Sequence, residues 1–343
     1  MNTDFKSYLL ASLPLIEDYL ASRIPEGQHQ SKTDRDLETY LFEPPARFID
    51  AGGKRVRPCL ALIGCEAAGA PKEKALSTGV AIELFQAAAL IHDDIADESE
   101  LRRSIPCLHI SDGIGLAINS GDSALVAASQ AILADETLDV DTRLALLNEF
   151  LTMQRRTLEG QALDLGWVRD GRWDLTVDDY LTMASLKTAY YSCANPLALG
   201  AMAGGGDTAL IDGLTSFGIS CGLAFQITDD LLNLADDGEE QGKDLKSDIS
   251  EGKRTLIMVY ALDHLEGSDR DRLIEILSSH TTDSAELDEA VALADKAGAL
   301  EYARAYALDL ARHAKQQLGC LPVEQEIREL LGSMADFFVE RRS

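Results

Sequence analysis

The sequence predicts an all-α protein, built as a single-domain bundle of helices around a central cavity. Ala, Leu, Glu and Arg, which favour helices, are frequent among its 343 residues. Apolar side chains recur every three or four positions between residues 141 and 163, as expected for one face of a helix. Alternation of apolar and polar residues, the pattern of strands, is nearly absent.

The predicted helices follow one another along the chain between short breaks. Residues 1–20 form an amphipathic helix, and their acidic residues argue against a signal peptide. Residues 79–98 and 141–163 form two further helices. Glycine, proline and polar residues mark breaks at 25–36, 103–113, 166–175, 203–207, 236–253 and 264–271. We therefore expect helices of about 15 to 30 residues in one domain that spans residues 1–343.

The chain is strongly acidic, with 58 acidic and 31 basic residues and a formal net charge of −27. Such a charge repels nucleic acid and anionic lipid surfaces, and an anionic substrate would need local cations or metal ions. The six cysteines lack the paired spacing of zinc or redox sites, so we expect reduced, mostly buried thiols. No uncharged apolar run reaches the ~18 residues of a membrane span. We expect a cytoplasmic protein that binds no nucleic acid and does not insert stably into a membrane.

An acidic motif, IHDDIADESELRR, ends the predicted helix 79–98. Helix geometry places Asp93 and Asp97 within ~40° of each other and ~6 Å apart along the axis, with Asp94 beside them. Stacked carboxylates repel each other unless a cation lies between them, and Mg²⁺ prefers such oxygen ligands. An ordinary acidic helix end is also compatible with one such motif, although acidic residues there oppose the helix dipole.

A second acidic motif, QITDDLLN, repeats this pattern with Asp229, Asp230 and Asn233. It follows GISCGLAFQI, whose small residues permit close helix packing. Two such clusters facing one cavity could hold two or three Mg²⁺ ions and bind a diphosphate from both sides. This arrangement would explain how so acidic a protein binds an anionic substrate.

Basic residues accompany both acidic motifs. The segment GGKRVRP places Lys54, Arg55 and Arg57 after a glycine turn and before a helix, where phosphate binding is favourable. Arg102 and Arg103 follow the first acidic motif. Further cations occur downstream at Lys187, Lys243 and Lys253. Each alone is more often a solvated charge, but together with two Asp motifs they indicate a diphosphate site.

These ordered motifs resemble those of the trans-isoprenyl diphosphate synthase family, also called polyprenyl synthetases. The resemblance runs from about residue 52 to residue 253 through GGKRVRP, DDIADESELRR, GQALDL, KTA, FQITDDLLN and GKDLKSDISEGKRT. It implies an isoprenoid-synthase-type helical bundle, a homodimer, and Mg²⁺-dependent condensation of isopentenyl diphosphate with an allylic diphosphate. Such chemistry needs no protein nucleophile, because catalysis is mainly electrostatic.

The resemblance also implies roles for individual residues. Six would bind Mg²⁺: Asp93, Asp94, Asp97, Asp229, Asp230 and Asn233. Four would hold isopentenyl diphosphate: Lys54, Arg57, Gln86 and Arg103. Four would hold the allylic diphosphate: Arg102, Lys187, Lys243 and Lys253. Lys187, Thr188 and Gln226 would act in catalysis, the last two by facing the transient allylic cation.

Three positions depart from the family pattern. Gln86 stands where many relatives have histidine, and either side chain can donate to phosphate. Ser104 replaces the glycine that usually follows the arginine pair. Asn233 replaces the last aspartate of the second motif, so it would bring an oxygen but no charge to a metal ion. None of these changes indicates an inactive enzyme.

The product length depends on the apolar residues below the first Asp motif. Family members that stop at C15 carry aromatic residues at the positions of Ala88 and Ala89. Phe85 is the first bulky residue of this stripe, ~12 Å below Asp93 and about one turn deeper than Ala88. We therefore predict geranylgeranyl diphosphate, C20, as the product. If Phe85 instead packs into a neighbouring helix as ordinary core, a longer chain of C30 or more follows.

Two other functions compete with chain elongation. A terpene cyclase would share the Asp motifs, but GGKRVRP and Arg103 build an isopentenyl diphosphate site that a cyclase does not need. A non-catalytic subunit that tunes a partner synthase would be expected to lose its Asp motifs, and here the first motif is intact. The sequence therefore favours an elongating prenyltransferase.

Overall fold

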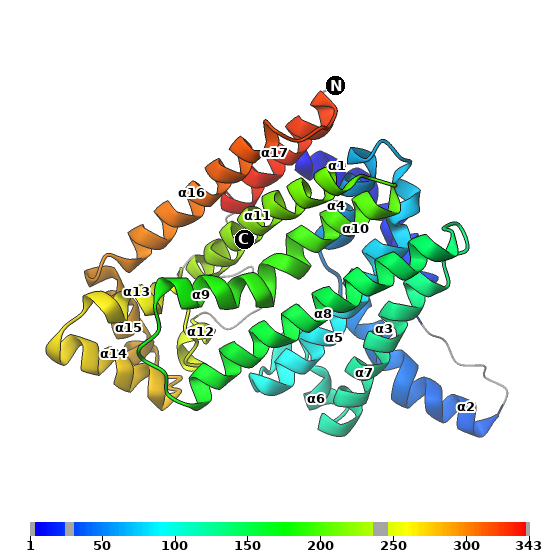
Figure 1. Cartoon of the computed structure of the whole chain (residues 1–343). Coiled ribbons are helices and arrows are strands. Elements are labelled where there is room, and N and C mark those ends of the chain that lie inside the picture. Colours follow the sequence, from blue (N-terminus) through cyan, green and yellow to red (C-terminus); the bar gives the residue numbers. More distant parts are fainter. Residues whose placement is uncertain (1–3, 25–30, 236–245, 341–343) are drawn as a thin grey trace. The chain divides into compact units, whose positions relative to one another are not determined.

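The computed structural model describes residues 4–24, 31–235 and 246–340, and nearly all its regular structure is helical (Figure 1). This confirms the predicted all-α class. The described chain forms two compact units, and the prediction of a single domain stays a prediction. Unit 1 comprises Met1–Thr152, Asn195–Leu214 and Pro322–Glu329. Unit 2 comprises Met153–Ala194, Thr215–Leu321 and Leu330–Ser343.

Unit 1 contains the N-terminal helices and the first acidic motif. Its complete elements are α1 (Phe5–Ala21), α2 (Lys32–Leu37), η1 (Glu38–Phe42), α3 (Glu43–Asp50), α4 (Val56–Ala67), η2 (Lys72–Ala75), α5 (Leu76–Ala96), β1 (Leu101–Arg102), β2 (Ile105–Pro106), α6 (Leu108–Ser111), α7 (Ile114–Leu133) and α10 (Asn195–Ala203). It also holds the N-terminal parts of α8 (Val140–Arg169), α11 (Thr208–Leu234) and α17 (Gln325–Glu340).

Unit 2 contains the second acidic motif and most C-terminal helices. Its complete elements are α9 (Val177–Ala184), η3 (Ser185–Ala194), α12 (Ser247–Ser250), α13 (Leu256–His264), α14 (Gly267–Ser279), α15 (Ser284–Lys296) and α16 (Ala299–Leu318). The C-terminal parts of α8, α11 and α17 complete it. A cluster of buried apolar side chains joins α9 and α11 to the four helices α13, α14, α15 and α16.

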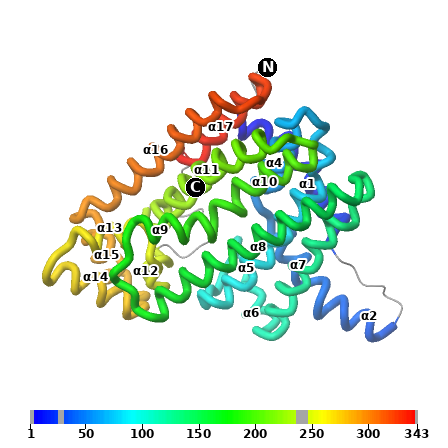
Figure 2. Tube along the Cα trace, viewed as in Figure 1, coloured from blue at the N-terminus to red at the C-terminus, as the bar shows by residue number. Residues whose placement is uncertain are grey.

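Helix α5 is the central element of unit 1. It packs most extensively against α7, and the two run side by side in Figure 2. Beside it, α4 and α10 touch backbone to backbone, because a Cβ at Gly64 would lie 2.1 Å from the carbonyl oxygen of Leu197. Most α5 side chains are buried, as expected for a core helix. This packing fixes the C-terminal end of α5, where the first acidic motif lies.

Glycines bring three backbones together in unit 2. A Cβ at Gly160 of α8 would lie 2.2 Å from the backbone nitrogen of Lys187 in η3. A Cβ at Gly222 of α11 would lie 2.6 Å from Cα of Ala189 on the same π-helix. These contacts confirm the close packing predicted from the small residues before the second acidic motif.

Several element bounds differ from the prediction. Helix α5 spans Leu76–Ala96 rather than 79–98, and α8 extends to Arg169, into an expected break. A short antiparallel hairpin, β1 with β2, replaces part of the loop expected at 103–113. Its turn residues Arg103 and Ser104 have φ of 53° and 65°, the left-handed values of a type I′ turn. Four further helices, α2, α6, α12 and α14, also begin or lie within expected breaks.

Two further predictions concern burial. All six cysteines are free, five are buried, and only Cys320 is exposed, in agreement with the expected reduced thiols. Two helices, Lys72–Ala96 and α11, are long and apolar enough to cross a membrane by length and composition alone. Core helices of soluble proteins pass the same test, and 78% of the apolar window is buried in the first helix and 50% in the second.

Candidate active site

The first acidic motif occupies the C-terminal end of α5. Asp93 and Asp94 lie in its last turn, and Asp97 is the C-cap. The backbone nitrogen of Asp97 donates to the carbonyl oxygen of Asp93 at 2.8 Å, so the helical geometry continues to the cap. Asp93 and Asp97 therefore lie one turn apart, as predicted, and both are half-buried.

Asp94 points into the protein and is 1% exposed. Its Oδ1 accepts a hydrogen bond from Nε of Arg102 at 2.5 Å. Its Oδ2 is buried and has no hydrogen-bond partner in the described part of the chain. Burial raises the pKa of Asp94, and the charge of Arg102 acts in the opposite direction. A buried carboxylate oxygen without a partner fits a site where a cation binds.

The basic side chains of the GGKRVRP segment differ in how exposed they are to solvent. Lys54 is exposed and Arg57 is half-buried, as a ligand-binding role requires. Arg55 instead is buried and forms ion pairs with Glu17 and Glu83, both at 2.8 Å. Sequence reasoning grouped Arg55 with the phosphate-binding cations, whereas the structure gives it internal partners.

Several guanidinium groups gather around this segment in unit 1. Burial lowers the pKa of Arg103, as do the nearby charges of Arg55, Arg102 and Arg57, while Glu83 raises it. A Cβ at Gly53 would lie 3.0 Å from Nη1 of Arg55 and 3.2 Å from Nη2 of Arg103. Like charges this close repel each other, so the cluster is suited to an anion.

The predicted chain-length residues lie along α5. Phe85 is 2% exposed and meets Phe150 of α8 edge to face, with ring centroids 6.3 Å apart. Ala88 is fully buried, whereas Gln86 and Ala89 are half-buried. Phe85 is thus held by a neighbouring helix, and its role as the floor of a product tunnel stays a prediction.

The second acidic motif lies near the end of α11 in unit 2. Both carboxylate oxygens of Asp230 are engaged, by the hydroxyl of Tyr180 at 2.8 Å and by Nε2 of Gln226 at 2.7 Å. Burial, with the nearby charges of Asp248 and Asp229, raises the pKa of Asp230 to about 8. Asp230 would have to exchange one of these bonds to bind a metal ion, whereas Asp229 is half-buried.

Asn233 joins α11 to the start of α12. Its Nδ2 donates to Oγ of Ser247 at 3.0 Å, and its Oδ1 accepts from the backbone nitrogen of Asp248 at 3.2 Å. An amide supplies both a donor and an acceptor, whereas an ionised carboxylate only accepts. Asn233 can therefore make both bonds at once, one as donor and one as acceptor.

Lys187 is positioned by the GQALDL motif. Its Nζ pairs with Oδ2 of Asp164 at 2.5 Å. Gly160 of the same motif leaves room for the Lys187 backbone, because a Cβ at Gly160 would lie 2.2 Å from its nitrogen. Thr188, the next residue, is buried.

Lys253 pairs with Glu251 and lies 3.9 Å from Asp248. Lys243, the remaining predicted cation, lies outside the described residues.

Comparisons with known proteins place the whole chain in one family. The family model of the polyprenyl synthetases matches residues 38–294. The chain belongs to this family. It is 41% identical to the short chain isoprenyl diphosphate synthase of Methanothermobacter thermautotrophicus, over 92% of this chain and 94% of the relative. It is 36% identical to the geranylfarnesyl diphosphate synthase of Natronomonas pharaonis, over 88% of this chain and 90% of the relative.

A solved structure agrees with the same assignment. The geranylgeranyl pyrophosphate synthase of Corynebacterium glutamicum, complexed with isoprenyl diphosphate and magnesium, matches with a TM-score of 0.85. The two chains are 28% identical, and the match covers 99% of this chain and 100% of that one. This polyprenyl synthetase is therefore a prenyltransferase, as its sequence predicts.

Sequence reasoning missed the partners that hold the predicted ligands of this polyprenyl synthetase. Asp164 and Asp248 stand within recognised motifs, so their presence there was the available signal. Tyr180 and Glu83 carry no sequence signal, because only the fold brings them to Asp230 and Arg55.

The structure groups the predicted residues within each unit: the first motif with the arginines, and the second with Lys187 and Lys253.

The described residues include no group of three or more His, Cys, Asp or Glu side chains arranged to hold a metal ion alone. Mg²⁺ is commonly bound by one or two carboxylates together with waters and substrate phosphates. The carboxylates of Asp93, Asp94 and Asp97 are of this type and lie at one helix end. The residues therefore fit a metal ion that substrate oxygens help to hold.

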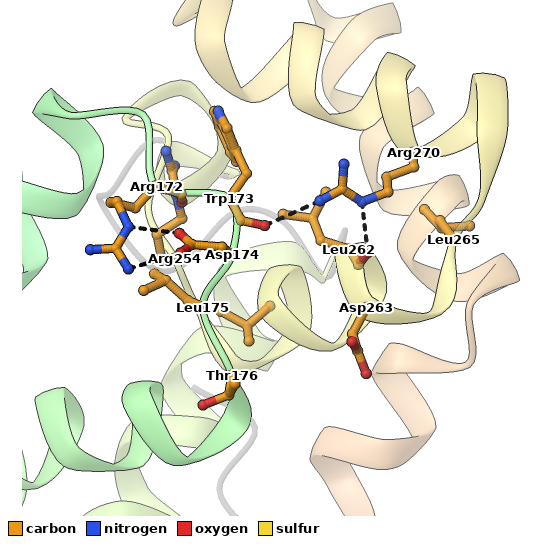
Figure 3. A pocket seen from close by; sticks show the side chains of 11 residues that line it. Arg172, Trp173, Asp174, Leu175, Thr176, Arg254, Leu262, Asp263, Leu265 and Arg270 are labelled. Carbon is orange, nitrogen blue, oxygen red and sulfur yellow. Dashed lines mark hydrogen bonds and ion pairs between the residues drawn. The ribbon is translucent and has the colours of Figure 1, made fainter.

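A separate pocket lies in unit 2 (Figure 3). It has a volume of about 270 Å³, and none of the predicted ligands lines it. Arg254 lies over the ring of Trp173, 3.6 Å from its centroid, and donates to the carbonyl oxygen of Arg172. Arg270 donates to the carbonyl oxygens of Leu262 and Trp173. These bonds tie the loop after α8 to α13 and α14.

Proposed function

We propose that this chain condenses isopentenyl diphosphate with an allylic diphosphate, with Mg²⁺ bound, to make geranylgeranyl diphosphate. The observation that carries the proposal is the arginine cluster of unit 1 beside the acidic end of α5. An elongating enzyme needs cations for one diphosphate and carboxylates for the metal ions that hold the other. The names of the related proteins support the same reaction.

The isopentenyl diphosphate site lies at the GGKRVRP segment. Lys54, Arg57 and Arg103 bind its phosphate oxygens, with Gln86 of α5 as a further donor. Lys54 is exposed and the others are half-buried, so they can be reached by a ligand. Arginine forks pair well with phosphate oxygens, and the clustered positive charge is relieved when an anion binds.

The allylic diphosphate is held by Arg102, Lys187, Lys243 and Lys253. Two or three Mg²⁺ ions would be held by Asp93, Asp94, Asp97, Asp229, Asp230 and Asn233. When bound, Mg²⁺ supplies positive charge to the departing diphosphate. Asp94 orients Arg102, and Asp164 orients Lys187, through the ion pairs described above.

The reaction breaks the allylic C–O bond and forms a new C–C bond. The double bond of isopentenyl diphosphate attacks the allylic cation, which the hydroxyl of Thr188 and the amide of Gln226 stabilise. Loss of a proton to the departing diphosphate then restores a double bond. The products are the extended prenyl diphosphate and free diphosphate, with no covalent enzyme intermediate.

Chain length is set by the stripe of α5 below the first acidic motif. Ala88 and Ala89 are small, and Phe85 is the first bulky residue, so we propose that growth stops at C20. The 36% identity with a geranylfarnesyl diphosphate synthase supports a second candidate product, one five-carbon unit longer. Chains of C30 or more require that Phe85 does not close the tunnel.

The enzyme acts as a cytoplasmic homodimer. Exposed apolar side chains on α6, α7 and α8 support this proposal, because large uncovered apolar surfaces commonly mark interfaces. Within unit 1 the exposed large apolar residues of these helices, here called the apolar stripe, are Ile110, Ile114, Ile118, Val126, Leu133, Val140, Leu144 and Leu151. A second copy of the chain, with the same stripe, is a suitable partner for such a surface.

The test measures incorporation of labelled isopentenyl diphosphate into prenyl chains by the purified enzyme. We expect incorporation with an allylic primer and Mg²⁺, and loss of incorporation when the metal is chelated. Asp93→Ala lowers the rate by at least ~100-fold, because a carboxylate that holds the metal is gone. Metal-independent incorporation would contradict the proposed chemistry. Cyclic products would support a terpene cyclase, and activity only with a second protein would support a partner subunit.

A further inference from the structure

The buried guanidinium of Arg55 joins four parts of unit 1. Arg55 adopts left-handed backbone angles, with φ of 48°, and is 4% exposed. Its Nη1 pairs with Glu83 of α5 and its Nε with Glu17 of α1, both at 2.8 Å. Its Nη2 donates to the carbonyl oxygen of Ile49 in α3 at 2.9 Å. The bonds hold a backbone conformation that arginine rarely adopts.

The same guanidinium lies directly beneath the glycine turn. A Cβ at Gly53 would lie 3.0 Å from Nη1 of Arg55 and 3.2 Å from Nη2 of Arg103. Arg103 also has left-handed angles, and its Nη1 donates to the carbonyl oxygen of Phe48 at 3.4 Å. Two arginines from separate strained turns therefore flank one glycine.

Glu83 is the negative charge that both arginines share. Its Oε1 pairs with Nη1 of Arg55. The Glu83 charge also raises the pKa of Arg103, because it favours the charged guanidinium. Its side chain is 5% exposed, and its Oε2 has no hydrogen-bond partner among the described residues. The carboxylate is thus too deep to contact a substrate, yet it lies below the segment that carries Lys54 and Arg57.

We propose that Glu83 is a positioning residue for the isopentenyl diphosphate site, acting through Arg55. This inference rests on the proposed function, which places that substrate at Lys54, Arg57 and Arg103. Glu83 holds the Arg55 side chain inside the protein, and Arg55 in turn fixes the backbone from Gly53 to Arg57. Two of the proposed allylic diphosphate ligands, Arg102 and Lys187, are held by other carboxylates, Asp94 and Asp164.

Two opposite effects compete when the Glu83 charge is removed. Without its carboxylate, the Arg55 guanidinium is buried and only partly paired, so it moves toward water and takes the glycine turn with it. Loss of a negative charge also makes the site more positive, which by itself would tighten anion binding. Positioning predicts weaker binding, whereas a purely electrostatic role predicts tighter binding, so the sign of the change separates the two.

The test compares Glu83→Gln with the wild-type enzyme. Titration calorimetry with isopentenyl diphosphate alone measures binding without turnover, because no allylic primer is present. We expect the Kd to rise about tenfold, which corresponds to about 1.4 kcal/mol of binding free energy. In steady-state assays KM for isopentenyl diphosphate rises similarly, while KM for the allylic primer stays within about twofold. Glu83→Asp, which keeps the charge, restores part of the affinity.

Glu66→Gln is the matched control. Glu66 lies on α4 and accepts a hydrogen bond from the hydroxyl of Tyr8 at 2.5 Å, away from the glycine turn. We expect this variant to lower Tm without changing the Kd for isopentenyl diphosphate. A Glu83→Gln enzyme with unchanged or tighter binding, or with equal changes in both KM values, would overturn the inference. The wild-type chain could be inactive and still bind isopentenyl diphosphate more tightly than Glu83→Gln does. That result would contradict only the proposed function.

Discussion

Asp164 illustrates how one buried carboxylate fixes a ligand-binding cation. Its Oδ2 pairs with Nζ of Lys187 at 2.5 Å, and its side chain is 6% exposed. Burial alone would raise the pKa of Asp164, but the charges of Lys187, Lys253 and Arg254 lower it below its ordinary value. The ionised carboxylate is therefore favoured in the folded state, and the pair contributes to stability.

Asp164→Asn should lower the free energy of unfolding by on the order of 3 kcal/mol at neutral pH, because Lys187 loses its partner. A carboxyl with a lowered folded pKa stabilises the protein above its unfolded pKa of about 4, and this contribution is lost as the pH falls further. The difference between variant and wild type should therefore shrink below about pH 4. Urea unfolding at several pH values measures it.

Asp170→Asn is the control for this prediction. Asp170 pairs with Arg169, but both side chains are exposed, so the urea midpoint should not move. An Asp164→Asn variant as stable as wild type at neutral pH would contradict the role assigned to the buried pair.

Phe85→Ala should lengthen the product by at least one five-carbon unit, because the first bulky residue of the stripe is removed. The same change should cost about 3–5 kcal/mol of stability, since Phe85 packs against Phe150. Mass spectrometry of the products and thermal unfolding measure the two effects. Phe5→Ala on α1, equally buried, is the control: it should lose stability without changing chain length.

At this scale the sequence predicted residue types better than their partners. The motifs identified Asp94, Arg102 and Lys187, because carboxylates and cations at those spacings suit a diphosphate. They could not show that Arg55 turns inward while Arg57 does not, since that depends on Glu83 and Glu17 from distant helices. Ion pairs between distant segments are a property of the fold.

Helix α7 positions the acidic end of α5 through a glycine. A Cβ at Gly121 would lie 2.3 Å from Nε2 of His92, the residue before Asp93. The imidazole also approaches the carbonyl oxygen of Ile118 at 3.3 Å and Asp122 at 3.6 Å. The two helices therefore fit together at the start of the first acidic motif.

Gly121→Ala should reduce activity at least ~10-fold and raise the Mg²⁺ concentration needed for half-maximal rate, because the new methyl group displaces His92 and the adjoining carboxylates. Steady-state kinetics over a range of Mg²⁺ concentrations measures both effects. Gly115→Ala on the same helix is the control, since a Cβ there meets no atom within 4 Å. It should retain activity and gain up to ~1 kcal/mol of helix stability. Equal activity in the two variants would contradict this role of α7.

Helices were the most predictable elements, because composition and apolar spacing are properties of the local sequence. The β1–β2 hairpin was not predicted, because its turn has left-handed angles at Arg103 and Ser104, residues that rarely adopt them. The π-helix η3 was not predicted either, since its close approach to Gly160 and Gly222 comes from tertiary packing.

For the whole molecule, composition and motif order were more informative than any single element. The acidic balance predicts that the chain binds no nucleic acid, and the ordered motifs from 52 to 253 lie within the family match of 38–294. The division into two compact units could not be predicted, because it falls inside α8, α11 and α17 rather than at linkers.

Leu151→Glu should convert the proposed homodimer into a monomer, because it places a charge in the exposed apolar stripe. Leu151 is 48% exposed on α8. Light scattering coupled to gel filtration should report half the wild-type mass. Leu308→Glu on α16, at 45% exposure, is the matched control and should leave the mass unchanged. A Leu151→Glu dimer would place the interface elsewhere.

The chain length of the wild-type product tests the central claim most directly. Purified enzyme is supplied with Mg²⁺, isopentenyl diphosphate and, in separate reactions, each of three allylic primers, and the products are read by mass spectrometry. The account predicts one dominant C20 diphosphate from every primer, because growth ends at Phe85. Chains of C30 or more would contradict the tunnel argument, and no elongation with any primer would contradict the proposed reaction.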